Sequence, residues 1–405
     1  MPLRPFILSC LILLISLAMP GWARAQGEPE VEVDNIQTEY EFGHQIVFQA
    51  QIRASAPISE IALFLQPQGD GGVKVINAEP GPDGHVRIVY DLEGERLRAF
   101  TNLTYHYQVV LETGEEFESD ELSLYYSDDR FNWRTLEGEP FVVYWYSGGL
   151  EFAQEILNVA QTGLDRAMEL LPLSEPERVH IYAYESAQDL QEALFLSGQN
   201  WVAGHADPDL GVILVSLPAG PEQRLEMERQ IPHELMHVLL YRRYGPGYRS
   251  LPTWLNEGLA TANELFPNPD YRVLLENGYR RDSLFSIASL CQVFPRDASG
   301  ALLAYAQSAS FTSYLYQQFG SPGMENLIGQ YTSGVACDRG VELAFGEPLS
   351  QLEIQWRRGT FAEDAGDAAL EGLLPWALVL AAILVVPLGL SIGALRKKPE
   401  LKEST

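Results

Sequence analysis

Basic residues are scarce in this chain, and the shortage excludes one class of partner. Lys and Arg total 27 against 55 Asp and Glu, giving a formal net charge of −28 at pH 7 over 405 residues. Because a surface of that sign repels a phosphate backbone, nucleic acid is not expected among the partners. The sequence also lacks an internal repeat of the length that builds solenoids.

Cysteine is nearly absent, with three residues in the whole chain. Cys10 lies in an apolar N-terminal run, which leaves Cys291 and Cys337. A disulfide-dense scaffold is therefore excluded, while one bridge between this pair stays open, since sequence does not show spatial adjacency. Apolar residues are not lacking: 46% hydrophobic and 11% aromatic content excludes a disordered or fibrous chain.

The N-terminal end has the form of a targeting segment. Within residues 1–25 an apolar run from Phe6 to Met19 follows Arg4, and Ala23-Arg24-Ala25 has the small-x-small form that signal peptidase cuts. We expect a secretory signal peptide. The alternative, an uncleaved membrane anchor, is less favoured because the run is short for a span of about 20 residues.

The C-terminal end carries a second apolar run. Leu373 to Leu395 holds no charged residue and is followed at once by Arg396-Lys397-Lys398. A run of this length predicts a transmembrane helix, and flanking basic residues stay in the cytoplasm. The expected topology is a single-pass type I protein of the cell membrane, with residues 396–405 as a cytoplasmic tail and everything before the span outside.

The first part of the remaining chain, residues 26–128, has the texture of an all-β domain. Short segments with period-2 alternation are separated by Gly- and Pro-rich turns at the spacing of an antiparallel sandwich, which predicts an immunoglobulin-like or fibronectin-like fold. The predicted strands are Gln45–Ile52, Glu60–Leu65, His85–Tyr90, Leu103–Leu111 and Leu122–Tyr126.

The second part, residues 129–365, alternates strands with helices and then becomes mainly helical, which predicts an α+β domain with its sheet first. Strands are expected at Phe141–Tyr146, Arg178–Tyr184 and Gly211–Leu217. Helices are expected at Leu150–Leu171, Ala187–Leu196, Arg224–Arg243, Leu255–Leu265, Ser299–Phe319, Gly323–Tyr331 and Leu349–Phe361.

One of these helices contains His233-Glu234-Leu235-Met236-His237, an H-E-x-x-H pattern. On a helix, two His at i and i+4 share one face about a turn apart, within reach of one metal ion. A carboxylate follows in the segment Trp254-Leu255-Asn256-Glu257-Gly258-Leu259-Ala260, at the start of another predicted helix. Nineteen residues separate this carboxylate, Glu257, from His237. Two His and one Glu form a known ligand set for catalytic zinc, which leaves one position open.

These two motifs resemble those of the gluzincin metallopeptidases, the clan that contains thermolysin and the aminopeptidase N family. The gap of nineteen residues between His237 and Glu257 matches thermolysin, whereas the N-E-G motif is closer to aminopeptidase N. The sequence resembles a divergent, membrane-anchored, peptidase MA-like group more than either prototype. The resemblance spans residues 141–361, but its specific motifs occupy only about a dozen positions. It implies a thermolysin-like (zincin) fold for the second domain.

The resemblance also implies roles for individual residues. His233, His237 and Glu257 would hold Zn²⁺, and Glu234 would be the general base that takes a proton from the attacking water. Relatives use a downstream Tyr or His as a further donor to the oxyanion. Tyr305 is the first choice for this role and Tyr316 the second, with a core position as the alternative for each.

Two further features leave alternatives open. Gly211–Ser216 precedes the metal helix, as does the edge strand with which gluzincin substrates pair, but an ordinary buried strand explains this segment equally well. Pro232 predicts that the metal helix begins at this residue, leaving Glu222–Gln230 as a separate turn or helix, because a proline ring clashes with the carbonyl four residues back.

The sequence therefore predicts a zinc-dependent peptidase outside the cytoplasm that acts on a peptide or protein substrate. The alternative is a catalytically retired peptidase fold whose β-sandwich binds or senses a ligand. The intact ligand set with its base favours the enzyme. The choice between endopeptidase and aminopeptidase action, the ligand of the sandwich and the oligomeric state are left open.

Overall fold

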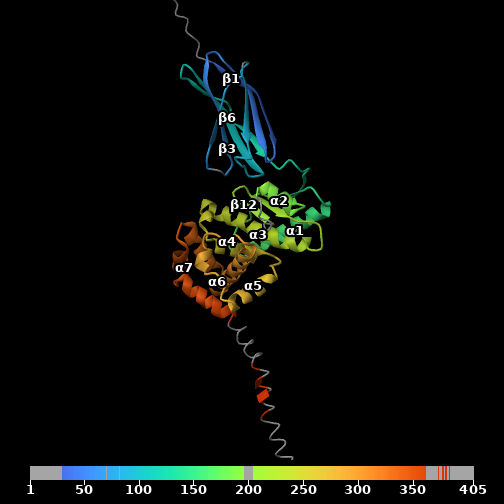
Figure 1. The fold of residues 1–405 in the computed structure, drawn as a ribbon, viewed down its shortest axis with the longest axis vertical. Helices are drawn as coiled ribbons and strands as arrows, with labels where there is room; N and C mark the ends of the chain where they lie inside the picture. The colour runs from blue at the N-terminus through green and yellow to red at the C-terminus, as the bar shows by residue number, and fades with distance from the viewer. Residues whose placement is uncertain are drawn as a thin grey trace, which may run out of the picture. The chain divides into compact units, whose positions relative to one another are not determined.

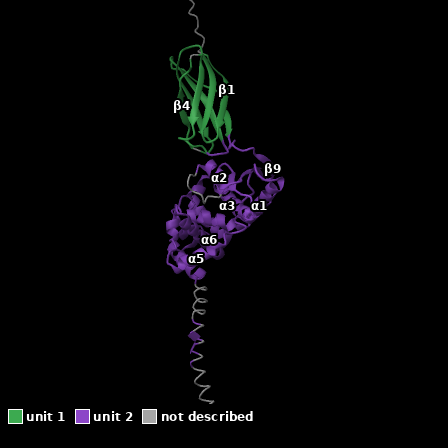
Figure 2. Ribbon diagram, turned by 45° about the vertical axis from the view of Figure 1, so that its right-hand side comes forward, with its two compact units in different colours: residues 1–97, 102–125 green, residues 98–101, 126–405 purple. Residues whose placement is uncertain are grey.

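The computed structural model describes residues 30–69, 71–81, 83–195 and 204–361, with six further residues between 373 and 383. The chain divides into two compact units, residues 1–97 with 102–125 and residues 98–101 with 126–405 (Figure 2). The predicted signal peptide and cytoplasmic tail, and most of the predicted span, lie outside the described residues. Within the described part, no helix is both long and apolar enough to cross a membrane.

The first unit is a pair of antiparallel sheets. One has the order β1 (Val31–Glu41), β2 (Gln45–Ala54), β5 (His85–Asp91). The other has the order β4 (Lys74–Ala78), β3 (Ile58–Pro67), β6 (Thr101–Leu111), β7 (Glu116–Glu118), and β8 (Leu122–Tyr126) also pairs with β6.

The two sheets pack face to face through alternate side chains. Residues of β5 and β6 alternate between buried and more exposed positions, as a half-buried strand requires. Phe48 of β2 meets Tyr105 of β6 with ring centroids 4.9 Å apart, which joins one sheet to the other. The five predicted strands are confirmed, whereas β1 was missed because its Glu, Asp and Asn residues have low strand propensity.

The second unit begins with a five-stranded mixed sheet (Figure 1). Three strands run parallel at its centre, and β9 and β12 flank them antiparallel at the two edges. The order is β12 (Gly204–Asp207), β13 (Val212–Ser216), β11 (Val179–Tyr184), β10 (Phe141–Trp145), β9 (Arg134–Gly138).

Helices pack on this sheet and then on one another. Helix α1 buries Ala153, Ile156, Ala160, Leu164 and Ala167 at the three- and four-residue spacing of an amphipathic helix. The described helices are α1 (Leu150–Leu170), α2 (Ala187–Leu194), α3 (Gln223–Tyr244), α4 (Thr253–Asn263), α5 (Asp270–Arg280), α6 (Ala298–Thr332), α7 (Cys337–Phe345), the 3₁₀ turns η1 (Gly245–Ser250) and η2 (Ile287–Leu290), and a last helix over residues 349–361.

Helix α3 differs from the rest because its central turns are buried all round. Residues 234–240 are buried without interruption, as expected for a helix enclosed by other elements. Its neighbours include α1, α4 and the strands β12 and β13. The H-E-x-x-H pattern therefore lies on the central helix of this unit.

The structure decides between the two interpretations of the strand before this helix and corrects the predicted start of the helix. The strand at residues 211–217 is not at the sheet edge, because β12 pairs with its outer side. All five residues of β13 are buried, which agrees with the alternative of an ordinary core strand. Helix α3 also does not begin at Pro232 but runs through it from Gln223.

Candidate metal centre

The three predicted metal ligands come together from two helices. His233 and His237 lie one turn apart on α3, and Glu257 lies in the second turn of α4. Glu257 Oε2 is 3.4 Å from His233 Nε2 and 3.8 Å from His237 Nε2. Potential ligand atoms of all three residues lie within 4.8 Å of one another. The predicted set is therefore a real cluster in space, although nineteen residues separate His237 from Glu257 in the sequence.

Pro232 is accommodated inside α3 by a contact from another part of the chain. A proline removes one helical N–H, so the carbonyl four residues back, that of Glu228, has no helical donor. The N–H of Leu265, just beyond α4, donates to this carbonyl at 2.9 Å. The proline ring packs against Gly163 of α1, where an added Cβ would lie 2.9 Å from Pro232 Cβ. The helix therefore continues, and His233 keeps its position.

The outer nitrogen of His233 faces a buried carboxylate. Its Nδ1 is 3.0 Å from Oε1 of Glu264, a residue only 2% exposed. Burial opposes protonation of His233, but hydrogen bonds to Glu257 and Glu264 outweigh it and hold the pKa of His233 well above its usual value. Glu264 therefore orients the ring so that Nε2 points inward.

The outer nitrogen of His237 faces neutral groups. Its Nδ1 is 3.1 Å from Asn256 Oδ1 and 3.1 Å from Tyr248 Oη, and Asn256 Nδ2 donates to the same hydroxyl at 3.0 Å. In the tautomer with a proton on Nδ1, the ring donates to the Asn256 oxygen and Nε2 is the inner atom that faces Glu257. Both imidazoles thus present the nitrogen that a metal needs, which is the usual role of such outer partners.

Glu257 itself is held as a carboxylate. Burial favours the neutral acid, but the neighbouring His237 and His233 and a hydrogen bond from Tyr305 lower the pKa of Glu257 below its usual value. The inner faces of the cluster therefore offer two imidazole nitrogens and one anionic oxygen, which is a donor set that fits zinc.

Glu234 is buried beside this cluster and lies against the edge strand β12. An added Cβ at Gly204 would lie 2.7 Å from Glu234 Oε1. Gly204 therefore leaves the room that the Glu234 carboxylate occupies, because any side chain there would displace it. The edge strand and the predicted base are in direct contact.

Tyr305 reaches the cluster from α6. Its ring centroid is 6.2 Å from that of His233, and its hydroxyl hydrogen-bonds to Glu257. Burial and the carboxylates of Glu257 and Glu234 raise the pKa of Tyr305 well above its usual value, so the phenol stays protonated and can donate. Tyr316 is eleven residues further along α6, about 16 Å by helical rise, and packs against the core.

The close approach of α6 to α4 depends on the glycine of the N-E-G segment. An added Cβ at Gly258 would lie 2.6 Å from the Ser308 carbonyl oxygen and would also collide with Thr312. A larger residue at this position would push α6 away, and Tyr305 with it. Close packing against α6 therefore explains why a glycine follows the predicted ligand Glu257.

A cavity of about 260 Å³ opens beside the cluster. His233, Glu234 and Tyr305 line one part of it, and Ala301 and Leu302 of α6 give it an apolar wall. A side chain or backbone segment of a ligand that entered this cavity would lie next to Glu234 and the inner faces of the cluster.

The two late cysteines form a disulfide near the same helices. Cys291 and Cys337 are bridged, with their Cα atoms 6.2 Å apart. The carbonyl of Cys291 accepts the N–H of Thr253, the first residue of α4, at 3.0 Å. The bridge that the sequence left open is therefore present, and it supports the start of the helix that carries Glu257.

Several residues of this site were not predicted. Asn256 belongs to the W-L-N-E-G-L-A segment, but no role was predicted for it. Glu264 follows Glu257 by seven residues, about two helical turns, and lies just past the end of α4. That spacing was a usable signal for a residue on the same side of the helix. Gly204, Tyr248 and the edge strand β12 gave no signal, because their roles depend on contacts with α3.

Comparisons with known proteins give matches of different strength. No curated protein matches the chain at a significant level. Among solved structures, an M1 zinc metallopeptidase from Deinococcus radiodurans is 13% identical, with 78% of this chain and 89% of that chain covered and a TM-score of 0.34. A two-domain M1 zinc metallopeptidase bound to L-arginine is 12% identical, with 82% and 92% covered and a TM-score of 0.33.

These identities and TM-scores are low, and family membership does not rest on them. The sequence profile of the Peptidase MA superfamily matches residues 159–362, half of the 405-residue chain. The matched segment contains His233, Glu234, His237, Glu257 and Tyr305. This chain belongs to the Peptidase MA superfamily.

Proposed function

We propose that this protein is a zinc-dependent peptidase that hydrolyses peptide bonds with His233, His237 and Glu257 as metal ligands. The observation that carries the proposal is the convergence of these three residues, whose potential ligand atoms lie within 4.8 Å of one another. The outer nitrogens of both His rings already have partners, so the inner nitrogens are the ones left for a metal. Family membership supports the same reaction class.

A bound zinc ion would supply a Lewis acid that polarises the scissile carbonyl and lowers the pKa of a water to about 7. Glu234 is buried, lines the cavity beside the ligands and carries no competing ion pair in the described part of the chain. We assign it to take the proton of the attacking water and to pass it to the leaving amine, the ordinary work of a positioned general base.

Tyr305 is assigned to donate a hydrogen bond to the oxyanion. Its phenol is kept protonated by burial and by the carboxylates around it, and its hydroxyl reaches the ligand cluster. A preorganised donor of this kind stabilises charge that develops in the transition state. Tyr316 is too far along α6 to share the role.

We propose a location from the two apolar runs, Phe6–Met19 and Leu373–Leu395. We infer secretion through residues 1–25 and anchoring by Leu373–Leu395, with the peptidase unit outside the cytoplasm and a thermolysin-like fold. The six described residues of that span are helical and exposed, which is compatible with a lipid-facing helix. The N-terminal sandwich would act as an immunoglobulin-like or fibronectin-like binding module or spacer.

The competing proposal is a retired peptidase fold that binds or senses a ligand through its sandwich. One observation disfavours it: Gly204 leaves space for the Glu234 carboxylate, a provision that a scaffold without catalysis does not need. The two proposals differ in whether a reconstituted protein cleaves peptide bonds.

The test is reconstitution of the full-length protein in detergent. After loading at neutral pH, we expect about one zinc per chain, and cleavage of casein that a chelator abolishes and zinc restores. Metal content near zero would refute the peptidase. Stoichiometric zinc without cleavage of a broad protein and peptide panel would favour the retired scaffold.

Topology needs its own experiment. Protease added to intact cells should remove the sandwich and the peptidase unit while a label at Thr405 stays protected. Protection of the peptidase unit would reverse the proposed orientation without affecting the chemistry.

A further inference from the structure

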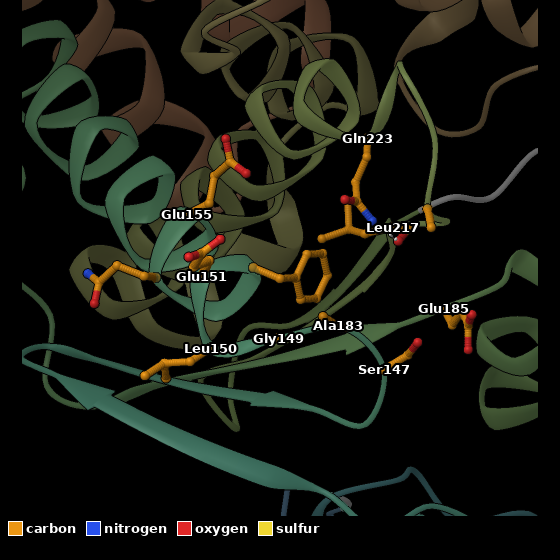
Figure 3. Close-up of a pocket in the computed structure, with 13 residues that line it drawn as sticks. Ser147, Gly149, Leu150, Glu151, Glu155, Ala183, Glu185, Leu217 and Gln223 are labelled. Carbon is orange, nitrogen blue, oxygen red and sulfur yellow. Dashed lines mark hydrogen bonds between the residues drawn. The ribbon is translucent and has the colours of Figure 1, made fainter.

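Three hollows of the peptidase unit lie in series, because each shares lining residues with the next, and the first adjoins the metal cluster. The cavity of about 260 Å³ beside His233 shares Glu226 and Gln230 with a second hollow of about 410 Å³. The second shares Ala219 and Gln223 with a third of about 840 Å³ (Figure 3). We call this series of hollows the groove. It follows the N-terminal half of α3 away from Glu234.

The far end of the groove lies where ligands bind in many α/β proteins. Ser147, Glu185 and Leu217 follow directly after the parallel strands β10, β11 and β13, so the third hollow lies at the carboxyl ends of these strands. From Glu234 to Gln223 the helix rises about 16 Å, which is the length of about five extended peptide residues. The groove is therefore long enough for a peptide segment.

The charge of the groove is strongly negative. Apart from Glu234 and Glu264, which lie beside the metal cluster, its lining includes five glutamates and a single arginine, Arg229. Arg229 pairs with Glu226, and Arg224 at the rim pairs with Glu155. The other three glutamates have no ion-pair partner among the described residues: Glu151, Glu185 and Glu222.

A buried acceptor without a partner lies in the wall of the same groove. Gln230 is 7% exposed and lines both hollows nearest the metal cluster. Its Nε2 donates to Glu226 at 3.0 Å and to the Ser216 carbonyl at 3.3 Å. Because both partners are acceptors, the orientation of the amide is set, and Oε1 is left buried with no donor. A buried oxygen without a donor is an unfavourable state, which a small shift of the Gln230 side chain toward a donor of a bound ligand would remove.

The glutamates of the groove are too dispersed to hold a metal ion. Within the described residues, the groups that converge closely enough are the His233, His237, Glu257 cluster and a set containing the bridged cysteines. The carboxylates instead follow one another along the groove. Separated negative charges and a free acceptor match a chain that carries several positive charges and N–H donors along its length.

From this geometry we infer that the groove binds the part of a peptide substrate on one side of the scissile bond and selects basic side chains there. The inference rests on the proposed peptidase function, since it places the scissile bond at the metal cluster. Glu151, Glu185 and Glu222 are the specificity-determining charges, and Gln230 accepts a hydrogen bond from the bound segment. The substrate class is therefore proteins with Lys- or Arg-rich segments close to an accessible bond.

The test uses peptides cut by the full-length zinc-loaded protein. A neutral segment of casein that the protein cleaves is synthesised as a set of fluorogenic, internally quenched peptides. Each peptide carries either a Lys pair or a Glu pair, placed three to five residues before or after the scissile bond. On one side only, we expect the Lys pair to raise kcat/KM about tenfold over the Glu pair at 50 mM salt, and much less at 500 mM. Equal rates for the Lys and Glu peptides on both sides overturn the inference.

Matched variants assign the preference to the groove. Glu151→Gln with Glu185→Gln and Glu222→Gln should bring the Lys-to-Glu ratio close to one. The control carries the same change of charge at exposed acids outside the groove, Glu121→Gln with Glu169→Gln and Glu175→Gln, and should keep the ratio. A preference that survives in the groove variant, or disappears equally in the control, refutes the assignment.

A binding measurement separates this inference from the peptidase proposal. Fluorescence anisotropy with the full-length Glu234→Gln protein and a labelled Lys-containing peptide should show salt-sensitive binding that the three groove substitutions weaken about tenfold and Gln230→Leu about fivefold. Such binding without cleavage by the parent protein keeps the groove and refutes the peptidase. Cleavage at equal rates for the Lys and Glu peptides, with peptide binding unchanged by the three groove substitutions and by Gln230→Leu, supports the peptidase and refutes the role of the groove.

Discussion

The two histidines of the metal cluster have the same inner environment and different outer ones. Both Nε2 atoms face the same oxygen of Glu257, at 3.4 Å and 3.8 Å. On the outer side, His233 meets the carboxylate of Glu264, whereas His237 meets the amide of Asn256 and the hydroxyl of Tyr248. A single sequence motif therefore produces one ligand supported by a charge and one supported by neutral dipoles.

This difference shows where the orientation of the cluster comes from. Asn256 belongs to α4 and Glu264 follows its last residue, so one helix contributes the third ligand and supports for both histidines. A carboxylate raises the basicity of an imidazole more than an amide does, because it interacts with the positive charge of the ring. We therefore expect α3 to place two equivalent histidines. We expect Glu264 and Asn256, which support them from outside, to make His233 bind zinc more strongly than His237.

The largest effect should come from the ligands themselves, where the two histidines should behave alike. His233→Ala and His237→Ala each leave two ligands, which hold zinc much more weakly than three. Zinc per chain, measured by elemental analysis after gel filtration, should fall from about one to near zero, and casein cleavage to background. A variant that keeps stoichiometric zinc would show that its histidine is not a ligand.

Glu234→Gln should separate chemistry from metal binding. The amide keeps the shape of the side chain beside Gly204 but cannot take a proton, so kcat should fall by about 10² to 10⁴. Zinc content should be unchanged, because the three ligands are untouched. Loss of zinc together with activity would make Glu234 a structural or ligating residue, and full activity would exclude it as the base.

Tyr305→Phe tests the donor that approaches from α6. Removal of the hydroxyl should lower kcat by about 10² to 10³ with KM and zinc content little changed, since the donor acts on the transition state. Tyr316→Phe on the same helix is the matched control and should be near the parent. Equal loss in both variants would indicate damage to α6 and not the loss of an oxyanion donor.

The smallest effects should distinguish the two outer environments. Glu264→Gln removes the charge behind His233 and should weaken zinc affinity by about 10- to 100-fold in a competition titration with a chromophoric chelator. Asn256→Ala should cost less than tenfold, because Tyr248 still contacts Nδ1 of His237. Equal losses of zinc affinity in the two variants would show that the negative charge of Glu264 does not strengthen zinc binding by His233.

The sequence alone predicted the ligands because their positions depend on short-range geometry. A helix places residues four apart on one face, so His233 and His237 had to be neighbours once the helix formed. The W-L-N-E-G-L-A segment identified Glu257 by its type and spacing. Strand alternation likewise predicted β5 and β6, because a half-buried strand must repeat every two residues.

Other features depended on partners distant in the chain. The sequence rule that a proline ends a helix failed at Pro232, because Leu265 supplies the donor for the carbonyl that the proline displaces and Gly163 makes room for the ring. At residues 211–216 the sequence left an edge strand and a buried strand equally open, because β12, a short segment ending in Asp207, has little strand character of its own.

Composition, periodicity and motif spacing thus determined the all-β and α+β character of the two units and predicted that His233, His237 and Glu257 converge, since these follow from local backbone geometry and residue chemistry. Tertiary structure alone decided the Cys291–Cys337 bridge, the carboxylate behind His233, the space that Gly204 leaves for Glu234 and the path of the acidic groove. Each of these depends on distances between atoms far apart in the chain, and packing, not sequence spacing, sets those distances.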